Sequence, residues 1–426
     1  MVKNFKVLMG AMLVTCLTLS PNRAALAAEN NNAEGLKILT YEIPQEAKSY
    51  AYEIAPTLLS NVVDNQKLYD VTIDRFEDLT LGEPYTIANF KDNAADKEVF
   101  YFPVLENDQV KLILSVTKSS GEWDATLGED IAEELNDIDS SKEYILYYDD
   151  GTTYAETEDG KTELFTDTLM KEKDTAVAEN MSFEEKVEKC EEKNGEDLAV
   201  SEPAKEELAD DEIGEQAIEK SNNYEGMVID DFNTDSALLA KKKVKLPHAD
   251  VGAFAPNPFS VFNETTKLLN TDECLVNQQD SNGQERGMCW AATVASIVRY
   301  MRGNNTLTAQ EVCDFMGIDY DLGATIEEMQ DALSKYGLSF KIKYHHSTWN
   351  EITQNIPNKK PIGIAAYSNL GGHAVTLIGY SEKDKKTITL WNSGNQKVQT
   401  STFKSDSADV TFIYGSAKWY WDSSLY

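Results

Sequence analysis

The chain has 426 residues with 39 basic and 73 acidic side chains, so its formal net charge at neutral pH is −34. This charge argues against a nucleic-acid partner, because phosphate binding depends on clustered Lys and Arg that displace counterions. A hydrophobic content of 41% excludes a wholly disordered chain, and five Cys in this length exclude a disulfide-dense miniature scaffold. The length fits two or three domains.

The first residues predict a secretory signal peptide over residues 1–27. Lys3 and Lys6 precede an apolar stretch over residues 7–19, and small residues around Ala27 offer a cleavage site. This stretch is shorter than the ~20 residues that a membrane span requires. No later segment is long and apolar enough to span a bilayer. We therefore expect a secreted, extracellular protein without membrane contact after its leader is removed.

Residues 28–170 predict a small α+β domain. Apolar residues recur at helical spacing over residues 47–63. Alternating or aromatic runs indicate strands at residues 85–90, 98–105, 110–116 and 144–148. One helix and four or five antiparallel strands would form such a domain. It has no cluster of His, Cys or paired carboxylates, so we expect a role in binding, inhibition or chaperoning.

Residues 171–250 predict an acidic linker, partly helical or disordered. Residues 179–225 hold 17 acidic side chains against five Lys, and they have too little apolar surface to offset their chain entropy. The basic segment 241–245 that follows is either open to proteases that cleave after Lys or an ordinary solvated loop. From residue 252 onward, 15 basic and 18 acidic residues nearly balance, so the excess negative charge lies upstream.

A polar string in this linker has the opening spacing of a calcium-binding loop, with oxygen ligands at Asp231, Asn233 and Asp235. Its sixth and twelfth places are Ser236 and Lys242, where such a loop needs Gly and Glu. We therefore expect a polar loop, and we expect neither a metal nor another cofactor.

The segment that carries chemistry spans residues 284–302. Apolar residues recur at helical spacing from Cys289 onward, and Gly287 marks the turn before them. A Cys at a helix N-terminus faces unpaired N–H groups and the positive end of the helix dipole, which stabilise a thiolate. An ordinary thiol, with a pKa near ~8.5, is only a few per cent ionised at neutral pH. The other interpretation is a buried structural cysteine.

Two later strands carry the partners that a cysteine nucleophile needs. His373 stands at the head of an apolar strand, and Asn392 ends the next one. His373 would take the thiol proton and later protonate the leaving amine, and Asn392 would hold the imidazole and its tautomer in place. His345 and His346 are competing bases, but no Asn-Ser string follows them at a suitable distance.

These segments together resemble papain-like cysteine peptidases. Gly-Met-Cys-Trp around Cys289 is similar to the family's Gly-Ser-Cys-Trp, and the strand of His373 is similar to its His-Ala-Val…Gly-Tyr strand. Trp-Asn-Ser around Asn392 resembles its Asn-Ser-Trp, and the chain order Cys, His, Asn is that of papain. Only 84 positions separate Cys289 from His373. This short spacing resembles the compact bacterial members, such as staphopain-like, streptopain-like, bacteriocin-leader-processing and type III effector peptidases.

The resemblance implies an α+β fold with a two-lobed catalytic domain over residues 255–426. A helical half would carry Cys289, a curved antiparallel sheet would form the other half, and the site would lie between them. Further helices are expected at residues 309–315 and 325–336. Strands are expected at residues 362–366, 373–380, 387–392 and 410–414. Trp290 would pack behind the nucleophile, and Trp391 would shield the bond between His373 and Asn392.

The resemblance also implies an oxyanion hole formed by the N–H of Cys289 and a Gln side chain. Gln284 is the first candidate, although it lies five positions before Cys289, one fewer than the usual spacing. Gln279 and Gln278 are alternatives that would need an inserted loop. In an oxidising compartment Cys274 and Cys313 could also form a disulfide, which spacing alone cannot establish.

The sequence therefore predicts a secreted cysteine endopeptidase that acts on protein or peptide substrates. The region before the catalytic domain would be an intramolecular inhibitory pro-region, or alternatively a permanently attached targeting domain. Two other functions stay open: an amidase or transglutaminase-type acyl transferase on the same fold, and a non-catalytic secreted surface-binding protein. Asn392 favours a peptidase over transglutaminases, which usually have Asp there. A catalytically silent domain would not need Cys289, His373 and Asn392 together.

Overall fold

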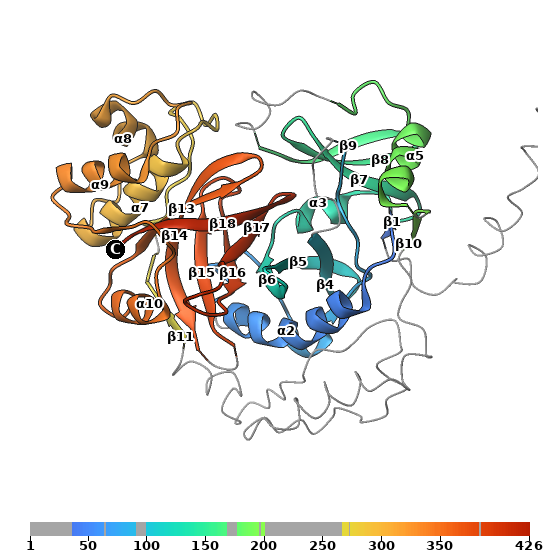
Figure 1. Ribbon diagram of the computed structural model, residues 1–426, viewed down its shortest axis with the longest axis horizontal. Coiled ribbons are helices and arrows are strands. Elements are labelled where there is room, and N and C mark those ends of the chain that lie inside the picture. The colour runs from blue at the N-terminus through green and yellow to red at the C-terminus, as the bar shows by residue number, and fades with distance from the viewer. Residues whose placement is uncertain are drawn as a thin grey trace, which may run out of the picture.

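The computed structural model describes residues 36–63, 65–90, 99–167, 177–195, 197–200, 266–271, 273–382 and 385–426. These residues form an N-terminal domain (residues 36–200) and a C-terminal domain (residues 266–426), which lie side by side in Figure 1. The predicted signal peptide, the calcium-like string at Asp231 and the basic segment 241–245 lie outside the described residues. No helix in the described ranges is long and apolar enough to cross a membrane.

A long helix covers an antiparallel meander in the N-terminal domain. This helix, α2 (Gln45–Val63), is the one predicted near residues 47–63. The strands of the meander are β2 (Thr80–Leu81), β4 (Val99–Glu106), β5 (Gln109–Ser119) and β6 (Glu122–Gly128). Ile54 and Leu58 of α2 are fully buried in the core that also contains Phe102 and Leu114 of the strands. The apolar stripe at helical spacing is therefore the face that covers the sheet.

A six-stranded sheet completes the N-terminal domain, in the order β10-β1-β7-β8-β9 with β3 beside β7. Its strands are β1 (Lys37–Thr40), β3 (Ala88–Asn89), β7 (Glu143–Asp149), β8 (Thr152–Thr157), β9 (Gly160–Thr166) and β10 (Ala199–Val200). Both β1 and β3 pair with β7 in parallel, whereas only antiparallel strands were expected. Parallel pairing joins segments that are distant along the chain, and local sequence patterns do not report it.

The N-terminal domain extends beyond the boundary predicted at residue 170. Helix α5 (Phe183–Asn194) begins with a capping box at Ser182, and Lys186 forms a buried ion pair with Glu156 at 2.9 Å. Strand β10 then pairs with β1. Residues 177–195 and 197–200 of the expected linker are thus folded onto the domain, and residues 201–265 lie outside the described part of the chain.

The C-terminal domain has the predicted helical half and sheet half. Its helices are α7 (Cys289–Arg302), α8 (Ala309–Met316), α9 (Ile326–Lys335) and α10 (Trp349–Asn355). Its strands are β11 (Thr266–Leu268), β12 (Ile342–Lys343), β13 (Ile362–Ser368), β14 (Gly371–Ser381), β15 (Thr387–Asn392), β16 (Lys397–Thr402), β17 (Thr411–Tyr414) and β18 (Ala417–Leu425). Capping boxes at Thr308 and Thr325 start α8 and α9. All three predicted helices, the one that begins at Cys289 included, and all four predicted strands of this domain are confirmed.

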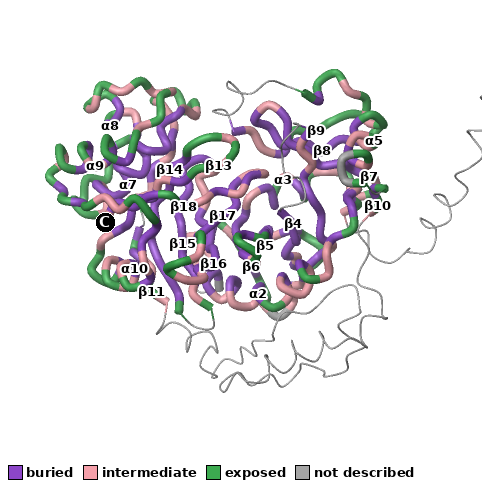
Figure 2. Tube along the Cα trace, viewed as in Figure 1, coloured by how far each residue is buried: buried purple, intermediate pink, exposed green. Residues whose placement is uncertain are grey.

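One twelve-stranded sheet runs through both domains, because β6 pairs antiparallel with β16. Ile378, Trp391 and Val398 of the C-terminal domain belong to the same apolar core as α2 and the meander. Figure 2 shows buried segments on both sides of this junction. Because the two domains share a sheet and a core, their interface is larger and more apolar than that between loosely linked domains.

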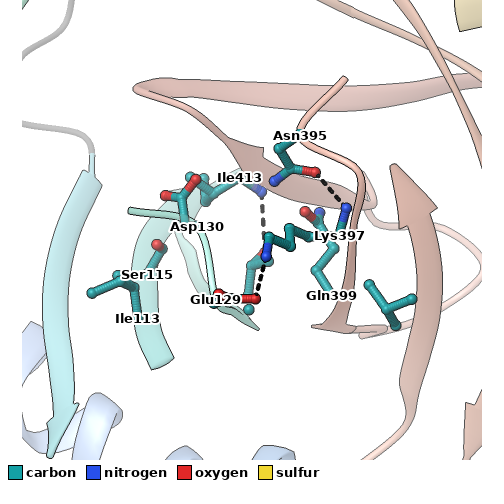
Figure 3. Close-up of a pocket in the computed structure, with 11 residues that line it drawn as sticks. Ile113, Ser115, Glu129, Asp130, Asn395, Lys397, Gln399 and Ile413 are labelled. Carbon is teal, nitrogen blue, oxygen red and sulfur yellow. Dashed lines mark hydrogen bonds and ion pairs between the residues drawn. The ribbon is translucent and has the colours of Figure 1, made fainter. Parts of the chain in front are cut away.

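Charged groups also lie at this junction, around a small cavity (Figure 3). Its polar wall includes Glu129 and Asp130 of the N-terminal domain and Asn395, Lys397 and Gln399 of the C-terminal domain. The Lys397 ammonium lies 2.6 Å from the carboxylate of Glu129. The junction therefore combines apolar contacts with ion pairs that join the two domains.

Candidate active site

Cys289 is the first residue of α7, where the backbone N–H groups of the first turn have no helical partners. Its side chain is 8% exposed. Its thiol lies next to the imidazole of His373 and the backbone at Ala374 and Trp290. Burial raises the pKa of the Cys289 thiol, but the hydrogen bond and charge of His373 outweigh this effect, so the pKa lies below that of an ordinary cysteine. The site therefore favours a thiolate.

The glycine before the nucleophile leaves room for a neighbouring loop. A Cβ atom on Gly287 would lie 2.9 Å from Cα of Asp321 and 3.0 Å from the carbonyl oxygen of Tyr320. The guanidinium of Arg286 pairs with the carboxylate of Asp321, with Nε 2.7 Å from one oxygen. The entry to α7 is therefore fixed against this loop by close packing and by an ion pair.

Two neighbouring strands bring the other two predicted residues to Cys289. His373 lies near the start of β14, and Asn392 ends β15, which pairs with β14. Nε2 of His373 lies 2.8 Å from Oδ1 of Asn392, which leaves Nδ1 for Cys289. Burial lowers the pKa of His373, but its hydrogen bonds to Cys289 and Asn392 and nearby negative charge outweigh this, so its pKa is raised. A lowered thiol pKa beside a raised imidazole pKa favours a thiolate–imidazolium pair.

Two aromatic rings of the β17–β18 hairpin contact the imidazole. The ring of Tyr414 stacks on that of His373 with centroids 5.0 Å apart and planes at 19°. The ring of Trp419 lies 5.2 Å from His373 at 55°. The sequence analysis did not assign either residue to the site, because both come from strands beyond the three motifs.

The prediction that Trp391 shields the bond between His373 and Asn392 is wrong. Trp391 donates its indole N–H to the carbonyl of Val276 at 3.1 Å, and its ring packs in the core shared with the N-terminal domain. Successive residues of a strand point to opposite faces, so Trp391 faces away from the side that Asn392 occupies.

The glutamine assignment also needs correction. Residues 279–285 form a small hairpin, in which Gln279 bridges to Glu285 and the N–H of Asp280 donates to the carbonyl of Gln284. Gln284 is exposed on this hairpin, and Gln279 is half-buried. Gln278, at the base of the hairpin, is 2% exposed. The hairpin is the inserted loop that a more distant glutamine requires.

The side chain of Gln278 contacts the residue that follows Asn392. Its amide oxygen is 3.2 Å from Oγ of this residue, Ser393. Its carbonyl accepts from the N–H of Arg286 at 2.9 Å. Of the three glutamines, the structure therefore favours Gln278, and not Gln284 or Gln279, as the candidate donor at the oxyanion position.

The competing histidines lie elsewhere. His346 is buried after β12, and its ring contacts Phe403 and Trp421. The ring of His345 packs against that of His346, with centroids 4.0 Å apart. His373 is the histidine that lies beside Cys289 and lowers the pKa of its thiol.

The remaining cysteine predictions have mixed outcomes. No disulfide joins Cys274 to Cys313 in the described structure. Cys313 is buried in the helical half, and burial raises the pKa of its thiol to about 12. Trp290 is 1% exposed in the same core, which confirms its predicted packing role. Within the described residues, no group of three or more His, Cys, Asp or Glu could hold a metal ion.

Comparison with known proteins bears on the same part of the chain. Residues 269–408 match a family described as papain-like cysteine protease AvrRpt2. The match includes Cys289, His373 and Asn392, and it ends before Tyr414 and Trp419. No curated protein matches the chain.

Proposed function

Because residues 269–408 belong to a papain-like cysteine peptidase family, we propose that this cysteine peptidase is a secreted endopeptidase made as a zymogen. In this proposal Cys289 is the nucleophile, His373 the general base and acid, and Asn392 the group that orients the imidazole. The observation that carries it is the placement of Cys289 at the start of α7 beside His373, whose imidazole hydrogen-bonds with Asn392. Substrates are proteins or peptides, and no cofactor takes part.

The reaction would proceed through an acyl-enzyme. The Cys289 thiolate attacks the carbonyl carbon of the scissile peptide bond and forms a C–S bond, while the carbonyl oxygen becomes an oxyanion. The His373 imidazolium donates its proton to the leaving amine as the C–N bond breaks, which leaves a thioester. A water molecule then gives a proton to His373 and attacks the thioester. Release of the carboxylic acid restores the thiolate–imidazolium pair.

The oxyanion would be stabilised by the N–H of Cys289 and the side-chain amide of Gln278. The proximity of Gln278 to Ser393, and hence to Asn392, supports this role. The start of α7 adds unpaired N–H groups and the positive end of the helix dipole. Donors fixed in this way stabilise charge that develops in the transition state more than charge in the substrate.

We infer that the N-terminal domain is the inhibitory pro-region of the zymogen. Cys289 and His373 are only 8% and 6% exposed in the intact chain. Phe165, at the end of β9, packs against Tyr414, the ring that stacks on His373. Export rests on the leader-like first 27 residues. Sequencing the N-terminus of the secreted enzyme tests this role: a start between residues 201 and 266 supports it, and an intact N-terminal domain supports permanent targeting instead.

The enzymatic proposal is tested by labelling the thiol and measuring hydrolysis. An epoxide inhibitor selective for papain-like thiols should label Cys289 in the activated protein and abolish cleavage of casein. Cys289→Ala should remove both labelling and cleavage while the protein stays folded. Cys313→Ala is the matched control, since Cys313 is a buried thiol whose pKa is raised. Casein cleavage by the Cys289→Ala protein would refute the nucleophile assignment.

A further inference from the structure

The imidazole of His373 is held from one side by a residue outside the matched region. Tyr414 ends β17, is 4% exposed and stacks on His373 with nearly parallel planes. An aromatic face attracts a cation, so this stacking favours the imidazolium over the neutral ring. Trp419 contacts the same imidazole at a larger angle. The hairpin of β17 and β18 therefore limits how His373 turns.

The hydroxyl end of Tyr414 reaches the neighbourhood of Asn392. A Cβ atom on Gly394 would overlap the Tyr414 hydroxyl oxygen, and it would lie 3.3 Å from Oδ1 of Asn392. The N–H of Gly394 donates to the same Oδ1 at 3.0 Å. The absence of a side chain at Gly394 thus lets the phenol lie beside the amide that binds His373.

The N-terminal domain contributes groups that lie around this phenol. Asp167, just after β9, is 9% exposed, and burial and then its charge raise the pKa of the Tyr414 phenol. Its own N–H donates to the carbonyl of Gly151 at 2.7 Å, which fixes the backbone there. Phe165 places its ring edge against Tyr414 at 5.8 Å and 73°. The N-terminal domain therefore touches the ring on which His373 stacks.

We propose that Tyr414 is a positioning residue for His373 and that Asp167 anchors it, so that the N-terminal domain supports the thiolate–imidazolium pair. This inference rests on the proposed function, because it concerns the same pair. In this proposal the Asp167 carboxylate accepts from the Tyr414 hydroxyl, which adds electron density to the ring and brings negative charge toward the imidazolium, and both effects favour the charged imidazole. The pro-region then limits access to the site while Cys289 and His373 keep their opposite charges.

The charges around these groups act in the same sense. After burial, the charges of Asp167, Glu285 and Asp130, all of them acidic, raise the pKa of Tyr414. Against the effect of burial, Cys289 and Asn392 raise the pKa of the His373 imidazole, and the charge of Asp167 raises it as well. Removing the Asp167 carboxylate should therefore lower the pH at which His373 loses its proton.

The test is an NMR titration of the intact chain labelled with ¹³C-histidine, which does not require access to the site. The chain has only four His, and a His373→Gln sample identifies the signal of interest. Asp167→Asn should lower the His373 titration midpoint by about 0.5–1 pH unit. Tyr414→Phe, which keeps the ring but loses the hydroxyl, should lower it by a similar amount, and Tyr414→Leu should lower it further. Thermal melting checks that each variant is folded.

Glu163→Gln is the matched control, because Glu163 is an exposed acid on the same strand β9. It should leave the midpoint unchanged. An unchanged midpoint in both Asp167→Asn and Tyr414→Phe would overturn the inference. A drop in Asp167→Asn alone would assign the carboxylate a direct effect on His373 and remove Tyr414 as its intermediary.

Failure of the proposed function gives a different result. Cys289→Ala removes the negative partner, so it should lower the His373 midpoint in the intact chain. A midpoint that does not respond to Cys289→Ala would mean that no thiolate–imidazolium pair exists, whatever Tyr414 does.

Discussion

Nε2 of His373 lies 2.8 Å from the amide oxygen of Asn392, and both side chains are buried. The same oxygen accepts from the N–H of Gly394 at 3.0 Å, so the amide is fixed from two sides. An amide oxygen fixed in this way selects the tautomer with a proton on Nε2 and leaves Nδ1 for Cys289. The orientation of the imidazole therefore depends on a side chain that exchanges no proton itself.

Asn392→Ala should lower kcat by about 10–100-fold, because a buried hydrogen bond to an ionised group is worth about 1–3 kcal/mol. Initial rates of the activated enzyme on a fluorogenic peptide measure kcat and KM separately, and KM should change little. Asn395→Ala is the control, since Asn395 lies three positions further at the domain junction. Wild-type kcat in Asn392→Ala would remove the amide from the mechanism.

Gln278→Ala should lower kcat by about 100-fold or more, as the loss of one oxyanion donor does in related hydrolases. Gln284→Ala should retain wild-type kcat, because Gln284 is exposed on the hairpin of residues 279–285. Each substitution removes one glutamine side chain from the same segment, so a difference in kcat between the two variants reports only where the lost amide lies. The reverse pattern would restore Gln284 to the oxyanion hole.

The three residues of the candidate site could be predicted to lie together because each lies in a short motif with its own local signal. Cys289 begins an amphipathic helix, and His373 and Asn392 lie on apolar strands that are close in sequence. Gln278 was harder to select, because the hairpin between it and Cys289 changes the spacing without changing the local composition. Position along the chain therefore favoured Gln284, and only the turn geometry shows that Gln284 faces solvent.

Contacts between the two domains could not be predicted in the same way. Asp167 and Tyr414 are separated by most of the C-terminal domain and by the undescribed residues 201–265. Neither residue belongs to a motif. The pairing of β6 with β16 likewise joins strands from different domains. In contrast, the sequence does predict the start of helix α5, since Ser182 and Glu185 form a capping box before apolar residues at helical spacing.

Gly287→Ala should destabilise the protein by about 1–3 kcal/mol, as overpacking of a close contact does. The added methyl group would press on the backbone at Asp321, and backbone moves less readily than a flexible side chain. Thermal melting measures the loss. Gly323→Ala is the control in the same loop, because a Cβ there meets nothing within 4 Å. Equal melting temperatures for the two variants would contradict the tight packing at Gly287.

Asp130→Asn should weaken the pH dependence of stability between about pH 4 and pH 7. Burial, and then the charge of Glu134, raise the pKa of Asp130 from 3.8 to about 7. The folded state therefore holds a proton that the unfolded chain has lost. Its contribution to stability is present below pH ~4 and is lost as the pH rises through about 7. The total loss has an upper limit of about 4 kcal/mol, at 1.36 kcal/mol for each pH unit.

Urea unfolding at a series of pH values measures this effect as the difference between wild type and variant. Asp130→Asn should lose less stability than the wild type as the pH rises from 5 to 8. Asp137→Asn removes the same charge from an exposed position on the neighbouring helix α3 (Ala132–Asp137), so its curve should follow the wild type. Parallel curves for all three proteins would show that Asp130 ionises normally in the fold.

A cut within residues 201–265 should leave the two domains bound to each other, because they share the β6–β16 pairing and one apolar core. Asp124 adds a buried link: its carboxylate lies 3.0 Å from the Lys404 ammonium and accepts from the Thr411 hydroxyl at 2.8 Å. Size-exclusion chromatography of a protein cut at an inserted protease site measures this association.

Asp124→Ala should weaken the association by about 1.5–3 kcal/mol, because it removes the buried carboxylate that pairs with Lys404, whose ammonium keeps its bonds to the carbonyls of Ser119 and Glu122. Ser120→Ala removes an exposed hydrogen bond to Asp409 at the same interface, so it should change the affinity by no more than about 0.5 kcal/mol. Separation of the wild-type fragments on the column would contradict a shared core. From the same contacts we expect that a single cut does not release the N-terminal domain. Buried strands and side chains, as well as the connecting chain, hold it on the peptidase.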